Sequence, residues 1–97
     1  MMQTDVKSAH ASTAGSYYAG RTRLRALVVS PKASTAATFE IRDGSSTGAV
    51  LYTMDIASNT NPNTFSILVP GEGILASTGL YLTLSTGTIT GITVFYG

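Results

Sequence analysis

Apolar and polar residues alternate with a period of two along much of the chain, and no other feature of the sequence constrains its fold as strongly. Successive side chains of a β-strand point to opposite faces of a sheet, so this alternation predicts strands with one buried face. An apolar stripe with the roughly 3.6-residue period of an amphipathic helix does not persist anywhere in the chain. The sequence therefore predicts an all-β protein in which any helix is at most one turn long.

Turn-forming residues divide the chain into short predicted strands. These cover residues 6–11, 21–30, 38–42, 49–55, 64–69, 74–76, 80–85 and 89–96. Asp43-Gly44 and Gly48 offer the positive φ angles of a hairpin loop, so the two strands that flank them are predicted to pair. Short strands with frequent turn signals are typical of sandwiches and small barrels. We expect a single-domain antiparallel β-sandwich of about 7–8 strands, jelly-roll or immunoglobulin-like, with the strand order left open.

The size of the chain limits it to one domain. It has 97 residues, enough for a two-layer core but not for a second one. We expect residues 1–20 to form an N-terminal arm or first strand and residues 21–97 to form the sandwich body. Charged residues make up 11% of the chain, against roughly 25% in an average domain, so Thr and Ser must supply most of the polar surface. The chain has no cysteine, so stability must come from packing or association rather than disulfides.

The charge of the chain is small and unevenly placed. Its formal net charge is +1, and all six basic residues lie within the first 42 positions. Little long-range repulsion therefore opposes close packing against copies of the chain or a scaffold. Nucleic-acid binding is not expected, because it usually needs several basic groups focused on one face. No stretch resembles a signal peptide or a membrane span of roughly 20 apolar residues, so we expect synthesis in a cytoplasm and no membrane partner.

The sequence does not contain the sets of residues that usually form a catalytic or metal-binding site. His10 is the only histidine, and no motif supplies the nucleophile, acid or further ligands that it would need. Asp43, Asp55 and Glu72 lie in or beside predicted loops but lack the spacing of a calcium loop. We therefore expect neither an enzyme nor a metal site, with His10 an ordinary polar residue of the first strand.

Residues 71–76 match the Gly-x-Gly-x-x-Ala pattern of dinucleotide-binding turns. Such a turn must open a helix whose N-terminus faces the pyrophosphate. Gly79 and the alternating residues after it are incompatible with a helix. We interpret the glycines as a sharp turn after Pro70 and expect no cofactor.

Arg21, Arg23 and Arg25 form the most informative local pattern, because period-two geometry places all three guanidinium groups on one strand face. The opposite face is then predicted to hold Thr22, Leu24, Ala26 and Val28. The arginines have three interpretations: a solvated outer face, an anchor for carboxylates on a partner subunit, or a nucleic-acid contact. The last is disfavoured, because no aromatic residue is interleaved with the arginines to stack on bases.

Tyr17 and Tyr18 are further interface candidates, because exposed Tyr is enriched at protein interfaces and on carbohydrate-contacting faces. If the chain is instead a receptor- or carbohydrate-binding module, a Tyr-lined loop at residues 15–20 is the predicted site. The absence of Trp weakens that alternative.

Five segments of the chain resemble those of small all-β virion structural proteins of tailed bacteriophages. They are AGRTRLR (19–25), RDG (42–44), VPGEGI (69–74), GLY (79–81) and TVFYG (93–97). The resemblance implies a capsid decoration or cement protein located in the virion, or else a tail, head-fibre or knob component. It implies the major capsid protein and copies of the chain itself, as a trimer, as partners, and it brings no catalytic residue. In such a protein the N-terminal residues would strap across a neighbour while rigid sheets clamp the shell.

Overall fold

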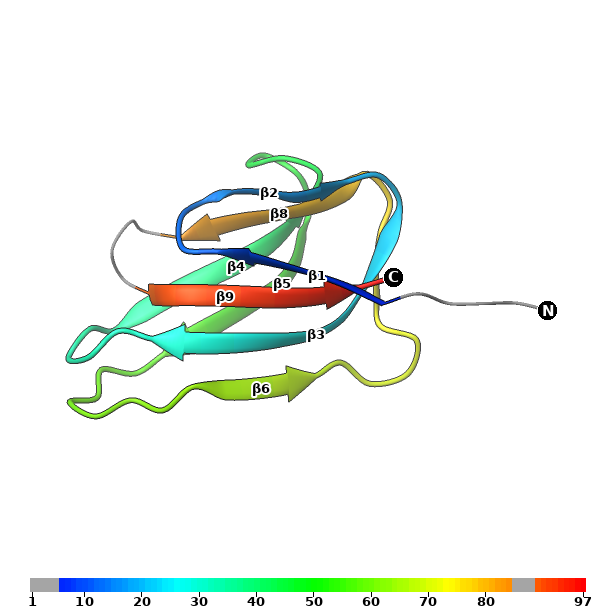
Figure 1. Ribbon diagram of the computed structural model, residues 1–97. Coiled ribbons are helices and arrows are strands. Elements are labelled where there is room, and N and C mark those ends of the chain that lie inside the picture. Colours follow the sequence, from blue (N-terminus) through cyan, green and yellow to red (C-terminus); the bar gives the residue numbers. More distant parts are fainter. Residues whose placement is uncertain (1–5, 85–88) are drawn as a thin grey trace.

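The computed structural model of the chain describes residues 6–84 and 89–97. Nine strands lie in these ranges: β1 (Lys7–Ala11), β2 (Gly15–Ala19), β3 (Thr22–Pro31), β4 (Ala37–Asp43), β5 (Val50–Ile56), β6 (Phe65–Leu68), β7 (Ile74–Ala76), β8 (Gly79–Leu84) and β9 (Ile89–Tyr96). They form two antiparallel sheets that lie face to face, so the predicted antiparallel β-sandwich is confirmed (Figure 1). No helix long and apolar enough to cross a membrane is found in the described ranges.

One sheet has the strand order β1-β9-β3-β6, and the other has the order β2-β8-β4-β5. β7 pairs with β3 along the same edge as β6, so that β6 lies beside residues 26–29 and β7 beside residues 22–24. The two strands are therefore halves of one edge strand, broken at a corner. Gly71 and Gly73 have φ angles of 68° and 91° at this corner, which favour glycine. The sharp turn predicted there is confirmed, and β7 follows it as a strand.

The strand pairs are nested inside one another. Counted with β6 and β7 as one strand, β1 pairs with β9, β2 with β8, β3 with β6–β7, and β4 with β5. The chain thus forms a long antiparallel ribbon, and the β3–β9 and β4–β8 pairs join this ribbon to itself as it rolls up. This arrangement is a jelly roll. Of the two sandwich types left open by the sequence, the strand order selects this one.

The core lies between the two sheets and is built from the inward-facing positions of four central strands. Its largest fully buried side chain is Phe39 on β4. Around it lie other fully buried aliphatic side chains, namely Leu24, Leu27, Val29, Ile41, Leu80, Leu82, Ile92 and Val94. Each comes from an apolar position of an alternating segment, and burying one such side chain is worth about 1.5–3 kcal/mol. The alternation of apolar and polar residues in the sequence therefore supplies the buried face of each sheet.

Each of the eight predicted strand segments overlaps a strand of the structure, with bounds that agree to within one residue, but β2 was not predicted. Three of its five residues are Gly15, Ser16 and Ala19, which have weak strand propensity, and it forms because it pairs with β8. Residues 7–11 and 15–19, which fall within the predicted N-terminal arm, pair within the chain. The predicted turn at residues 86–88 and the start of the arm at residues 1–5 lie outside the described residues.

The predicted division of β3 into two faces is wrong beyond Leu24. Leu24 lies opposite Tyr96 and Ala26 opposite Phe95, so Arg25 is an extra residue in the ladder, a β-bulge. The bulge shifts the alternation by one position. The inward side chains after Leu24 are therefore Leu27 and Val29. The outer face holds Ala26 and Val28, two residues predicted to share the face of Leu24.

The predicted hairpin between β4 and β5 is confirmed. Gly44 has a φ of 80°, as its place at the start of the loop predicts. Gly48 serves a different purpose from the one predicted, because it does not have a positive φ. A Cβ at this position would overlap the carbonyl oxygen of Asp43, so only glycine allows the loop to close this tightly.

Candidate protein-binding surface

Apolar side chains are exposed on the outer face of the β1-β9-β3-β6 sheet. The strand register places Ser8, Phe95, Ala26 and Leu68 in one row across four strands. Leu68 is 82% exposed, and Phe95 and Ala26 are half-buried. Leu75 on β7, opposite Arg23, is 36% exposed. Neighbouring positions of such a row lie about 4.5–5.5 Å apart, so Phe95, Ala26 and Leu68 form one continuous surface, which we call the apolar row.

A second row beside it is more polar. It consists of His10, Thr93, Val28 and Ser66, again from four strands. The imidazole of His10 lies over Gly91, where a Cβ would overlap it, so the missing side chain at residue 91 makes room for the ring. His10 is thus an exposed polar residue of β1, as predicted. No group of three or more His, Cys, Asp or Glu side chains able to hold a metal ion occurs among the described residues.

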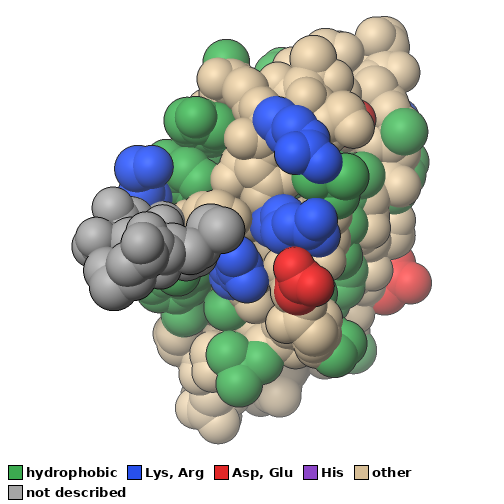
Figure 2. Space-filling model, turned by 90° about the vertical axis from the view of Figure 1, so that its right-hand side faces the viewer, with side chains coloured by type: hydrophobic (Ala, Val, Ile, Leu, Met, Phe, Trp, Pro, Cys, Tyr) green, Lys and Arg blue, Asp and Glu red, His purple; other side chains and the backbone are tan. Residues whose placement is uncertain are grey.

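The predicted arginines lie at one end of this sheet. Arg21 lies just before β3 and is exposed. Arg23 and Arg25 lie near the start of β3 and are half-buried. Lys7 on β1 lies at the same end of the sheet. It pairs with Tyr96 on β9, and Tyr96 pairs with Leu24, the neighbour of Arg23 and Arg25 on β3. We call these four cations the basic end. Seen from this side, Lys and Arg side chains gather around the end of the molecule with few acidic side chains among them (Figure 2).

The cations of the basic end differ in how they are held. The carbonyl oxygen of Arg23 accepts a hydrogen bond from the N–H of Gly97 at 3.1 Å. Arg25 donates from Nη2 to the carbonyl oxygen of Gly97 at 3.5 Å, and its Nε is buried without a partner among the described residues. Glu72 follows Gly71 in the corner between β6 and β7, and position 73 lies against Arg23. Within the described ranges, no ion pair joins Glu72 to an arginine.

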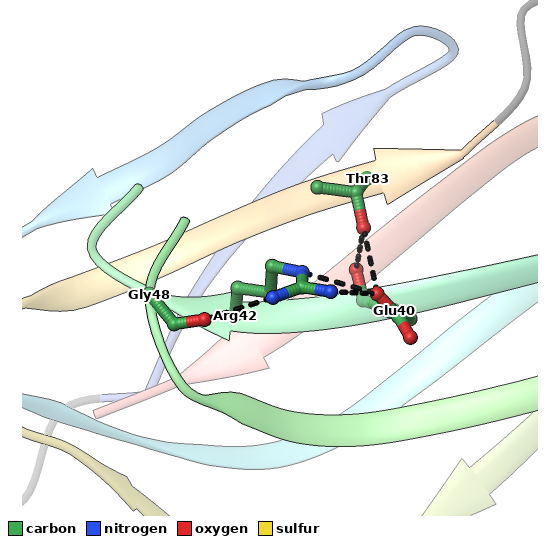
Figure 3. A network of polar contacts seen from close by, with 4 residues as sticks. All are labelled: Glu40, Arg42, Gly48 and Thr83. Atoms are coloured by element: carbon green, nitrogen blue, oxygen red, sulfur yellow. Dashed lines mark hydrogen bonds and ion pairs between the residues drawn. The ribbon is translucent and has the colours of Figure 1, made fainter. Parts of the chain in front are cut away.

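Arg42 and Glu40 show the contrasting case of an arginine that is fully engaged. Arg42 donates to Oε1 of Glu40 from Nε at 3.0 Å and from Nη2 at 2.6 Å (Figure 3). Its Nη1 donates to the carbonyl oxygen of Gly48 at 3.0 Å, which ties the β4–β5 loop to β4. Thr83 on β8 adds a hydrogen bond to the same carboxylate oxygen at 3.5 Å. This network stabilises the outer face of the second sheet and leaves the Arg42 guanidinium little capacity for a partner.

The carboxylate of Asp43 also accepts hydrogen bonds from within the chain. Its Oδ1 accepts hydrogen bonds from the backbone N–H groups of Thr78 at 2.8 Å and Gly79 at 3.3 Å. These bonds, the one from Thr78 above all, lower the pKa of the Asp43 carboxyl below its ordinary value. The side chain predicted to belong to a hairpin turn therefore joins that hairpin to the turn before β8.

Tyr17 and Tyr18, the other predicted interface residues, make contacts inside the chain. The Tyr17 hydroxyl donates to the carbonyl oxygen of Ile92 at 2.9 Å, and burial raises the pKa of this hydroxyl. The ring of Tyr18 packs against Tyr96 with 5.0 Å between centroids. Both residues are half-buried on β2, so the Tyr-lined loop predicted for residues 15–20 is a strand instead. Contact of either tyrosine with a partner stays a prediction.

No family model, curated protein or solved structure matches the chain. The candidate surface therefore rests on the geometry of the chain itself: an apolar row, bordered at one end by cations. Sequence reasoning found the cations but missed Leu68 and Leu75. The signal was present, because Phe65, Ile67 and Val69 alternate as inward residues and leave Leu68 on the face where a polar residue is usual.

Proposed function

We propose that this protein is a structural subunit of a virus particle that binds the outer surface of the capsid as a decoration or cement protein. One observation carries the proposal: Leu68, a large apolar side chain 82% exposed, shares its row with Phe95 and lies beside the basic end. Apolar surface rimmed by polar and charged groups is typical of protein-binding sites. The resemblance to tailed-phage virion proteins supplies the partner, the major capsid protein.

The architecture supports such a role. Jelly rolls recur in viral capsid proteins and in lectins, although a fold alone does not determine function. A sandwich whose sheets are joined through a dense core resists deformation, which suits a clamp between shell subunits. A specific interface covers about 800 Å² per partner, and the whole chain exposes 5433 Å², so one outer sheet face is large enough to supply one such contact.

Sedimentation with decoration-free capsids tests the proposal directly. Purified protein should pellet with such capsids, and Leu68→Ser should weaken this binding about tenfold, because burying one Leu side chain is worth about 1.5–3 kcal/mol. Val50→Ser is the matched control, because Val50 is also exposed, at 46%, but lies on the edge strand of the other sheet. Both variants should keep the melting temperature of the parent chain.

One result would reject the cement role: failure of the parent chain to bind capsids while it binds tails or host cells. That result would favour the tail, head-fibre or knob alternative, and a glycan array then tests for carbohydrate binding. Equal capsid binding by the parent chain and the Leu68 variant would leave the cement role standing and place the contact elsewhere on the molecule.

A further inference from the structure

We propose that the basic end docks on a carboxylate-bearing surface of a different protein chain and not on a second copy of this chain. The proposal deepens the proposed function and rests on it for the identity of the partner, the capsid shell. It assigns the two kinds of predicted contact, with the shell and with copies of the chain, to different parts of the molecule.

The cations of the basic end have hydrogen-bond donors that are not paired with carboxylates of the described residues. Within the described ranges, none of Lys7, Arg21, Arg23 and Arg25 forms an ion pair with a carboxylate. Arg21 is exposed, and the Nε of Arg25 is buried without a hydrogen-bond partner among residues 6–84 and 89–97. Arg42 shows what an arginine engaged within this chain looks like, with bonds from three nitrogens. The cations of the basic end thus keep the capacity for the paired, bidentate bonds that guanidinium groups make with carboxylates.

A second copy of the chain has no matching acidic surface among its described residues. Glu40 is bound to Arg42 at 2.6 Å, and Asp43 is bound by the turn before β8. Asp55 accepts a hydrogen bond from Thr38 at 2.8 Å and lies as a single charge on β5. Glu72 lies in the corner between β6 and β7, next to Gly73, whose position lies against Arg23 at the same end of the sheet. Two copies meeting symmetrically at this end would place cations against cations, and like charges opposed at an interface cost several kcal/mol.

The surroundings of the cations favour a protein partner over nucleic acid. Arg23 lies opposite Leu75, and the apolar row with Leu68 and Phe95 begins beside it. A protein segment that alternates carboxylate and apolar side chains matches both parts, whereas a phosphate backbone matches only the charges. Base stacking would need fully exposed aromatic rings, whereas the exposed apolar side chains of this surface are Leu68 and Leu75, and its one aromatic ring among the described residues, that of Phe95, is half-buried.

The test compares two variants that change the net charge equally. Arg21→Gln with Arg23→Gln removes two charges from the basic end, and Lys32→Glu makes the same change of net charge just after β3, at the opposite end of the sheet. Decoration-free capsids should bind the double variant at least about tenfold more weakly than the parent chain, and this binding should depend less on salt concentration. Both effects are expected because charged residues at the edge of an interface contribute to its affinity and to its salt dependence. Lys32→Glu should bind within about twofold of the parent. Thermal melting confirms that each variant is folded.

Sedimentation velocity of the same proteins separates the shell contact from self-association. The double variant should keep the oligomeric state of the parent chain; dissociation of an oligomer would overturn the proposal, because the arginines would then join copies. Equal capsid binding by the double variant and the parent would also overturn it and leave the cement role standing. If the parent chain does not bind capsids but binds a 30-base-pair DNA duplex through Arg21 and Arg23, the cement role and the proposal both fail.

Discussion

At the scale of single residues, Tyr17 joins the two sheets through one hydrogen bond. Its hydroxyl lies on β2, and the carbonyl oxygen that accepts the bond belongs to Ile92 on β9. Tyr17→Phe should lower the free energy of unfolding by about 0.5–1.5 kcal/mol at pH 7, the usual net worth of such a bond. Tyr18→Phe is the control, because its hydroxyl makes no hydrogen bond with the described residues. Urea unfolding of the three proteins measures the difference.

The same tyrosine predicts a dependence on alkaline pH. Burial raises the pKa of Tyr17 above its ordinary value of 10.0, so the folded protein holds this proton more tightly than the unfolded chain. Its contribution to stability is therefore complete below pH 10 and is lost as the pH rises above that value. The difference between the parent chain and Tyr17→Phe should shrink above about pH 10. An unchanged difference there would show that the hydroxyl is not buried.

Asp43 predicts the opposite dependence, at acid pH. Its pKa is lowered below 3.8, first by the N–H of Thr78, so its carboxylate contributes stability above pH 3.8, and this contribution is lost as the pH falls through the lowered pKa. Asp43→Asn should therefore melt at a lower temperature than the parent chain at pH 7, and the two melting temperatures should converge in acid. Asp55→Asn removes the same charge from an exposed strand position and controls for the loss of one negative charge at pH 7.

At the scale of elements, the bulge in β3 decides which side chains fill the core. Leu27 is fully buried, whereas Val28 lies on the outer face. Leu27→Ala should lower the free energy of unfolding by about 2–5 kcal/mol, the range for emptying a core position. Val28→Ala should cost less than about 1 kcal/mol. Chemical denaturation of both variants measures the two losses, and a larger loss for Val28 would restore the uninterrupted alternation that the sequence predicts.

One physical cause explains which strands the sequence predicted and why it predicted the faces of β3 wrongly. Alternation reports burial, so segments such as Ile89–Tyr96 were predicted with correct bounds. A bulge leaves no trace in composition, because it depends on which residues of the partner strand lie opposite. β2 was missed for the same reason: pairing with β8 forms it, and its own residues do not. Strand order and the row that joins Leu68 to Phe95 across the sheet also depend on pairing, so the sequence predicted neither, although it did predict the arginines.

At the scale of the whole molecule, the nested pairs of the jelly roll differ in how much chain must be closed to form them. β4 and β5 are separated only by residues 44–49, whereas β1 and β9 are separated by residues 12–88. The entropic cost of closure rises with the length of the loop, so the inner pair should form before the outer one. The ribbon is then expected to close from the β4–β5 hairpin outward.

Matched substitutions test this order of folding. Ile41→Val on β4 and Ile92→Val on β9 remove the same methylene from fully buried positions, at a cost of about 0.5–1.5 kcal/mol each. Ile41→Val should mainly slow folding, because β4 belongs to the early hairpin, and Ile92→Val should mainly speed unfolding. Stopped-flow kinetics in denaturant separates the two rates. The reverse partition would mean that the outer pair of strands forms first.

The pairing of β3 with β9 places Gly97 beside Arg23 and Arg25. A reporter or display cargo fused after Gly97 would therefore stand over the arginines and shield them while the sandwich beneath stays folded. The loop between β5 and β6, residues 57–64, lies at the far end of the molecule and is the better point of attachment for any label meant to leave that end uncovered.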